Sequence, residues 1–328
     1  MSPPAAHASP STTVTTPDAT RRLTGLACGM GAGALWGLVF LAPALVHDFS
    51  PLMLAVGRHL CFGLIALALA LPRWQTLTTG LTQPRLVQLF WLALAGNTLY
   101  YVLLSSAVQH GGIAMTSLVV GFMPVAVTLI GSRDHGAVPL GRLLPSLLFC
   151  VIGALCIGWQ ALAGPHTTHW GTALWGLLCA VGALVAWTAY AVGNARALQG
   201  EQSPSAHDWN LLIGVMTGLQ CLILLPLALM LNTGEHSAEA WWRFGAVSVG
   251  VAVLASLLGN ALWNRMSQLL PLTLVGQMIL FETLFALLYG FVWESRWPHA
   301  LEVVALVCVV LSVALCLRAH RSPGQTPE

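Results

Sequence analysis

The sequence predicts an all-α integral membrane protein, and three observations predict it. Of the 328 residues, 57% are hydrophobic and only 7% are charged. The mean hydropathy is +0.78, whereas a soluble domain needs a much more polar surface. About ten apolar segments, each near the length that crosses a ~30 Å hydrocarbon layer, are separated by short polar turns. Their continuous apolar character, without in/out alternation, favours helices over a β-barrel.

The apolar segments define the expected helices in chain order. Residues 1–22 are rich in Pro, Ser, Thr and Ala and are expected to form a disordered cytoplasmic tail. The first apolar run is too long for a cleaved signal and nine more follow it, so it is expected to remain as a helix. The expected spans are 24–46, 51–71, 86–108, 113–131, 141–162, 171–192, 209–231, 244–264, 272–292 and 300–318, and 320–328 form a second cytoplasmic tail.

The arginines predict the orientation, because the chain has no lysine. With the N-terminus inside, ten arginines lie on the cytoplasmic side, and only Arg243 and Arg296 lie outside. The ten are Arg21, Arg22, Arg73, Arg85, Arg133, Arg142, Arg196, Arg265, Arg318 and Arg321. This bias predicts an even number of spans with both termini cytoplasmic.

The two halves of the chain resemble each other. Gly96-Asn97-Thr98-Leu99-Tyr100 in the third span matches Gly259-Asn260-Ala261-Leu262-Trp263 in the eighth. Ala34-Leu35-Trp36 and Val185-Ala186-Trp187 form a weaker match. Five spans, an odd number, separate the copies, so the second copy enters the membrane from the opposite side. This predicts two inverted five-helix repeats, over 23–162 and 163–319, and favours a transporter whose central site opens to each side in turn.

Several motifs support this reading. They are Gly33-Ala34-Leu35-Trp36-Gly37-Leu38-Val39-Phe40, Ser50-Pro51, Gly57-Arg58, Gly96-Asn97, Phe122-Met123-Pro124-Val125, Gly259-Asn260 and Phe281-Glu282-Thr283-Leu284. On these motifs the chain resembles the EamA-type members of the drug/metabolite transporter superfamily over roughly residues 24 to 318. Asn264-Arg265-Met266-Ser267-Gln268-Leu269-Leu270-Pro271 is similar to a motif of a bacterial inner-membrane branch. The resemblance implies ten helices around a central cavity that moves small metabolites, often outward.

The chain departs from the family pattern at two places. Thr283 stands where the family has proline after the glutamate, and Gly131-Ser132-Arg133-Asp134 stands where a Gly-Glu pair is common. The resemblance therefore does not carry over the substrate of the better-known members.

Glu282 is the one acidic residue near the middle of an expected span. An ionised carboxylate in hydrocarbon costs a few kcal/mol or more, so it must face a cavity, find a partner or be protonated. As a functional group it would carry a proton or balance a substrate amine. As a structural group it would be a neutral acid that bonds its helix to a neighbour.

Arg58 is the matching cation, about seven residues into the second span and about 10 Å below its boundary. Its charge is permanent, so it must snorkel, pair or line water. It would bind a substrate carboxylate or pair with Glu282 in one state, or else satisfy helix-end carbonyls or lipid headgroups.

Asn97 and Asn260 occupy equivalent positions of the repeat, so either a shared functional role or helix-bonding amides is expected. Further cavity-lining candidates supply aromatic faces and hydrogen-bonding groups, with packing or interfacial anchoring as the alternative for each. These candidates are Tyr100, Tyr101, Trp263, Asn264, Gln277, Trp36, Trp187 and Tyr190. Glycines at every fourth position of the first span, Gly25, Gly29, Gly33 and Gly37, predict a flat ridge for helix packing, or a sliding or dimer surface.

The remaining observations limit the function classes. The sequence contains no phosphate-binding loop, metal-binding spacing or catalytic constellation, and its eight cysteines lack CxxC spacing. No cofactor, metal or nucleic-acid partner is therefore expected. The leading hypothesis is a secondary transporter that exports small metabolites such as amino acids, coupled to protons or a counter-substrate, as a monomer or homodimer. The alternatives are a membrane enzyme acting on a lipid, with Glu282 as acid/base, and a non-transporting scaffold or sensor.

Overall fold

The computed structural model describes residues 17–46, 48–79, 81–133, 138–162, 170–199, 204–293, 295, 297–298 and 300–320. Within these ranges the chain is helical and contains no strand. Five helices are long and apolar enough to cross a membrane, and three shorter apolar helices accompany them. The prediction of an all-α membrane protein is confirmed, while the count of ten spans stays a prediction.

The bundle contains α-helices joined by short 3₁₀ and π-helical segments. Most expected spans correspond to a run of consecutive elements. In chain order the elements are α1 (Pro17–Gly37), η1 (Leu38–Leu41), α2 (Ala42–Leu45), α3 (Pro51–Ala70), η2 (Leu71–Arg73), α4 (Trp74–Thr78), α5 (Gln83–Ala93), η3 (Leu94–Thr98), α6 (Leu99–Val120), α7 (Met123–Gly131), α8 (Leu140–Leu162), α9 (Trp170–Gln199), α10 (Ala206–Leu231), α11 (Ala238–Val251), η4 (Ala252–Gly259), α12 (Asn260–Leu269), α13 (Leu272–Met278), α14 (Leu280–Trp293) and α15 (Ala300–Ala319).

Two boundaries differ from those expected. Helix α1 begins at Pro17, so the last six residues of the expected 1–22 tail are helical, while residues 1–16 and 321–328 lie outside the described residues. Helix α6 continues through the expected turn at 109–112 and ends at Val120. The break instead precedes Pro124, which lies in the first turn of α7, where a missing N–H costs no intrahelical bond.

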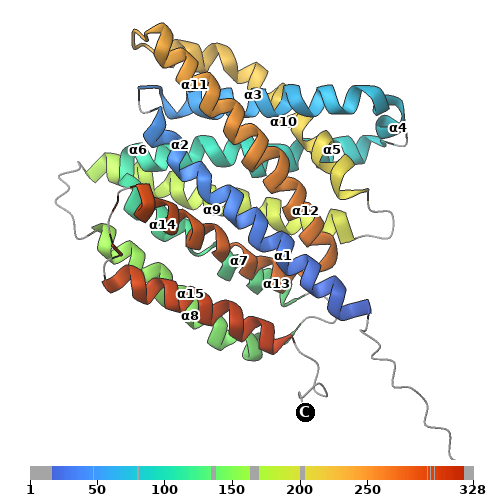
Figure 1. Cartoon of the computed structure of the whole chain (residues 1–328), viewed down its shortest axis with the longest axis vertical. Coiled ribbons are helices and arrows are strands. Elements are labelled where there is room, and N and C mark those ends of the chain that lie inside the picture. The colour runs from blue at the N-terminus through green and yellow to red at the C-terminus, as the bar shows by residue number, and fades with distance from the viewer. Residues whose placement is uncertain are drawn as a thin grey trace, which may run out of the picture.

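Besides α6 and α9, three pairs of helices pack closely: α3 with α10, α7 with α13, and α8 with α15. Figure 1 shows α3 and α10 at one side of the bundle and α8 and α15 at the opposite side, with α1, α6, α9 and α12 between them. Each pair runs antiparallel. For α3 and α10, the amide of Ser50, before α3, donates to Asn232, after α10, while Arg73, after α3, pairs with Asp208 in the first turn of α10.

Each helix pair also has a contact that is reciprocal. A Cβ added to Gly218 of α10 would lie 2.7 Å from Gly63 Cα of α3, and a Cβ added to Gly63 would meet Gly218. The Ser146 hydroxyl of α8 donates to the Ser312 carbonyl of α15 over 2.8 Å, and the Ser312 hydroxyl donates to the Ser146 carbonyl over 2.7 Å. Such two-way contacts are the pattern of a local two-fold relation between packed helices.

The α7–α13 pair shows the same reciprocity through a short shared motif. Thr128-Leu129-Ile130-Gly131 and Thr273-Leu274-Val275-Gly276 cross each other. A Cβ on Gly131 would lie 3.0 Å from the Thr273 nitrogen, and one on Gly276 would lie 2.9 Å from the Thr128 hydroxyl. Helix α14 instead packs against α1, so the ninth expected span changes partner at Ile279, between its two helices.

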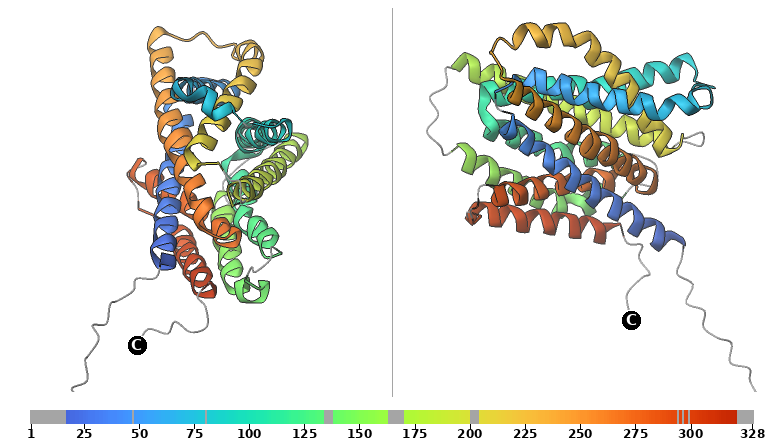
Figure 2. Two further views of the ribbon diagram at one scale, coloured as in Figure 1. Left: turned by 90° about the vertical axis from the view of Figure 1, so that its right-hand side faces the viewer. Right: turned by 45° about the horizontal axis from the view of Figure 1, so that its top comes forward.

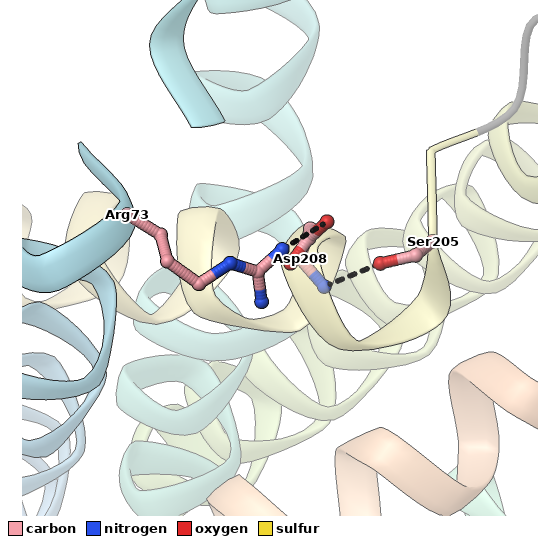
Figure 3. Close-up of polar contacts among 3 residues, drawn as sticks. All are labelled: Arg73, Ser205 and Asp208. Carbon is pink, nitrogen blue, oxygen red and sulfur yellow. Dashed lines mark hydrogen bonds and ion pairs between the residues drawn. The ribbon is translucent and has the colours of Figure 1, made fainter. Parts of the chain in front are cut away.

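The two ends of the bundle differ in their polar contacts. We name the end that holds the first turn of α1 and the last turn of α15 the terminal end, and the opposite end the distal end (Figures 1 and 2). At the terminal end, Arg22 donates to the His320 carbonyl over 3.0 Å. Figure 3 shows another contact at this end, where Arg73 lies 3.1 Å from Asp208 and the amide of Asp208 donates to the Ser205 hydroxyl.

The outer surface of the bundle is strongly apolar. Many large side chains on the flanks are more than half exposed, Ile223 at 79% and Leu64 at 66% among them. Exposed tryptophans add to this surface, Trp242 and Trp297 at the distal end among them. This surface suits contact with lipid rather than with water.

Candidate functional site

Aromatic side chains from both halves of the chain meet in the middle of the bundle. Trp263 of α12 lies 5.0 Å from Trp36 of α1 and 5.4 Å from Trp187 of α9, measured between ring centroids. Tyr190 of α9 and Tyr100 of α6 lie 6.0 and 6.4 Å from Trp187. We call these five residues the aromatic cluster. Four helices contribute to it, so a relative movement of the helices must change its shape.

The two Gly-Asn motifs lie at π-helical segments. Asn97 belongs to η3, and Asn260 directly follows η4. The Trp36 indole donates to the Asn260 side-chain oxygen over 3.2 Å and to the Ala255 carbonyl over 3.1 Å. Asn97 instead donates to the Thr217 hydroxyl of α10 over 3.2 Å. The two asparagines therefore bond different helices, and π-helical segments of this kind are frequent at functional sites.

Arg58 of α3 is buried, with 8% of its surface exposed. Its Nε donates to the Ser256 hydroxyl of η4 over 3.0 Å, and its guanidinium carbon lies 5.1 Å from the centre of the Tyr101 ring. The His59 ring packs edge-on against the same tyrosine. The Nε bond and the ring contact leave the two terminal guanidinium nitrogens as donors for a ligand.

Glu282 lies in the first turn of α14 and is half-buried. Among the described residues, its carboxylate forms neither a hydrogen bond nor an ion pair within 4.0 Å. Arg58 and Glu282 thus form no ion pair with each other in this conformation.

The glycine ridge of α1 allows the helix that carries Glu282 to approach closely. A Cβ on Gly33 would lie 2.9 Å from the Glu282 nitrogen, and one on Gly37 would lie 2.9 Å from the Ala286 nitrogen. Gly25 faces Leu269 and Leu270 at the end of α12, and Gly29 faces Met266 of α12 and Met278 of α13. The four glycines therefore contact helices of this chain. Bulkier residues would displace α14, and with it the carboxylate.

Two of the expected cavity-lining residues belong to separate hydrogen-bond networks instead. Gln277 donates to the Thr128 hydroxyl over 3.2 Å, between α13 and α7, and its side-chain oxygen lies 3.0 Å from the Ser312 hydroxyl of α15, sharing that hydroxyl's one proton with the Ser146 carbonyl. Asn264 accepts from Asn194 over 2.9 Å, between α12 and α9. Both side chains are almost fully buried. In this conformation they join helices and do not face Arg58 or Glu282.

Sequence reasoning missed Ser256, which holds Arg58 in place. In the sequence, Ser256 is marked only by its position one turn before Asn260. A serine within an apolar run is typical of a small packing residue, so this position alone does not indicate a site residue. Among the described residues, no three His, Cys, Asp or Glu side chains lie close enough to hold a metal ion.

The fold and this polar centre define a multi-pass helical membrane protein. The EamA-like transporter family model matches residues 23–159 and again residues 174–318. The chain therefore belongs to the EamA-like transporter family and is a membrane transporter by family. It is 31% identical over 325 residues to the inner membrane protein YtfF of Escherichia coli (strain K12), a match that covers 90% of this chain and 96% of that protein.

One solved crystal structure of a protein shares the fold. It superposes with a TM-score of 0.72 and covers 92% of this chain and 99% of that one, at 19% sequence identity. At that identity the likeness extends to the fold alone. The prediction of the family from the Gly-Asn and Phe-Glu-Thr motifs is confirmed by the family match.

Proposed function

We propose that the protein is a secondary transporter that exports a small zwitterionic metabolite, such as an amino acid, by alternating access. The observation that carries the proposal is that Arg58, bonded through Nε to Ser256 of η4, and Glu282, packed against the glycine ridge of α1, form no ion pair with each other. A substrate carboxylate would bind the terminal guanidinium nitrogens, and a substrate ammonium group would bind the carboxylate of Glu282. The apolar part of the substrate would lie against the aromatic cluster.

The mechanism requires two halves that exchange conformations. We propose ten membrane spans in two inverted five-helix repeats, over 23–162 and 163–319. The antiparallel packing of α3 on α10, α7 on α13 and α8 on α15 supports this arrangement, because each pair joins helices at equivalent positions of the two halves. The two family matches, one per half, support it further.

We also propose that the terminal end faces the cytoplasm of a bacterial inner membrane. The inner-membrane location of the relative YtfF and the gathering of arginines at this end support the orientation. Glu282 would then couple transport to protons, because a carboxylate without a fixed partner can bind a proton or a substrate ammonium, but not both at once. The functional unit is a monomer or a homodimer.

The test uses purified protein in liposomes with a labelled amino-acid and metabolite pool. Glu282→Gln keeps the side-chain shape and removes the charge, so we expect accumulation driven by a pH gradient to fail, while counterflow persists at a lower substrate affinity because the Gln oxygen still accepts from the substrate ammonium. Arg58→Gln removes a charged hydrogen-bond donor, so substrate affinity should fall by about 10- to 100-fold. Glu239→Gln, at an exposed position of α11, is the matched control.

The outcomes separate the hypotheses. A Glu282→Gln variant with unchanged gradient-driven uptake makes this residue a structural acid and removes the coupling role. A wild-type protein that moves no member of the pool, and whose melting temperature no member shifts, removes the transport proposal. Altered lipid species on incubation with the pure protein would favour the lipid-enzyme alternative.

A further inference from the structure

A chain of hydrogen bonds at the distal end joins the start of α3 to the end of α10. The amide of Ser50 donates to the side-chain oxygen of Asn232 over 3.2 Å. The side-chain nitrogen of Asn232 lies 3.1 Å from Nε2 of His236. We call these three residues the distal clasp. It fastens the segment before α3 to the loop between α10 and α11.

The donors and acceptors of the distal clasp fix the protonation of His236. A backbone N–H can only donate, so the oxygen of the Asn232 amide must face Ser50. The amide nitrogen, which also can only donate, must then face His236. Nε2 of His236 therefore accepts a hydrogen bond and carries no proton, and the imidazole is neutral in this conformation.

The imidazole is held in place and is also open to water. It stacks on the Phe49 ring with centroids 4.1 Å apart and an angle of 16° between the planes. It meets the Trp241 ring edge-on at 5.8 Å. Phe49 is buried, whereas His236 is only half-buried and lines a surface hollow. A proton from solution can therefore reach the ring.

The charged groups around the hollow come from each element packed there. Asp48 precedes α3 and accepts from Arg243 of α11 over 2.6 Å. Glu235 lies in the loop beside His236, and Glu239 lies in the first turn of α11. The charged side chains that face the hollow are therefore three carboxylates and one guanidinium.

We infer that protonation of His236 breaks the hydrogen bonds of the distal clasp. Protonation places an N–H on Nε2, opposite the N–H of Asn232, and two donors repel. Rotating the Asn232 amide would remove the clash with His236, but it would turn the amide nitrogen toward the Ser50 N–H. Two donors would then face each other at Ser50 instead. Withdrawing the imidazole would end its stacking on Phe49. In each case the clasp breaks, and the segment before α3 loosens at acidic pH.

This inference goes beyond the proposed transport activity and needs no substrate. In the proposed orientation the distal end faces outward, so external acid would act on the clasp directly. The release would then connect the external pH to the mobility of the α3–α10 pair, on which Arg58 depends.

Hydrogen exchange of full-length protein in lipid nanodiscs tests the clasp. Protection of the backbone from Phe49 to Met53 is compared at about pH 7.5 and about pH 5.5, which bracket the ordinary histidine titration, after correction for intrinsic exchange. We expect protection to fall several-fold at the lower pH. In His236→Gln, whose side-chain oxygen accepts but does not titrate, the fall should be absent. His207→Gln, on α10 at the terminal end, is the matched control and should behave as wild type.

Asn232→Asp supplies a second test that reverses the sign. Its carboxylate can accept from Ser50 and also from a protonated His236, so the lower pH should strengthen the clasp and raise protection. Wild-type protection that does not change with pH would overturn the inference. So would a His236→Gln variant that loses protection as wild type does, or an Asn232→Asp variant whose protection also falls.

Discussion

The contact between Gly63 and Gly218 predicts a large effect from one methyl group. In Gly218→Ala, the new Cβ would lie 2.7 Å from the Gly63 Cα, whereas ordinary carbon contacts begin at 3.4 Å. Because the opposing atom is backbone, no side chain can rotate away, and α3 and α10 must separate by about 0.7 Å. We expect this overpacking to lower the free energy of unfolding by about 1–3 kcal/mol.

Reversible unfolding in mixed detergent and SDS micelles, followed by tryptophan fluorescence, measures the effect. Gly245→Ala is the matched control, because a Cβ added there has open space within 4 Å. Its better helix propensity should add about 0.5–1 kcal/mol. The reasoning is refuted if Gly218→Ala unfolds at the same SDS fraction as Gly245→Ala, since the two helices would then not touch at this point.

Two further predictions concern hydrogen bonding and pH. Trp36→Phe removes the indole N–H that donates to Ala255 and Asn260, so it should lower the free energy of unfolding by about 1–2 kcal/mol. Trp263→Phe should lower it less, because the Trp263 indole N–H has no hydrogen-bond partner among the described residues. Burial lowers the pKa of His320 at the terminal end, so the unfolded state binds its proton first and stability should fall as pH drops below about 6.5. Thermal unfolding of wild type and His320→Gln checks this slope, which the variant should lack.

Much of the fold follows from hydropathy, because lipid leaves the chain few alternatives. Helical character, the family and most helix positions follow from apolar runs and local motifs. Helix boundaries were harder to predict where one apolar run could either contain a turn or continue as a helix. Helix α6 passes through the expected turn at 109–112, and the break comes before Pro124, where the missing N–H favours a new helix start.

The candidate site was only partly predictable, since residue type does not reveal which helix a side chain meets. Arg58 and Glu282 stood out because a charge in a span is costly. Their failure to pair here, and the use of Ser256 as the partner of Arg58, depend on helix positions that no local pattern encodes. A buried amide needs hydrogen-bond partners, which either a polar cavity or a neighbouring helix can supply. The sequence of Gln277 therefore fits a cavity-lining residue as well as the observed link between α7 and α15.

The unequal use of the two Gly-Asn motifs is what the proposed alternating access requires. In this conformation Trp36 bonds Asn260, while Asn97 bonds Thr217. Trp187 corresponds to Trp36 in the proposed repeat, as Asn97 corresponds to Asn260. If the halves exchange conformations, Trp187 takes the role of Trp36 and bonds Asn97, and the Trp36 bond opens. The exchange would thus replace one indole–amide bond by its counterpart in the other half and change the shape of the aromatic cluster.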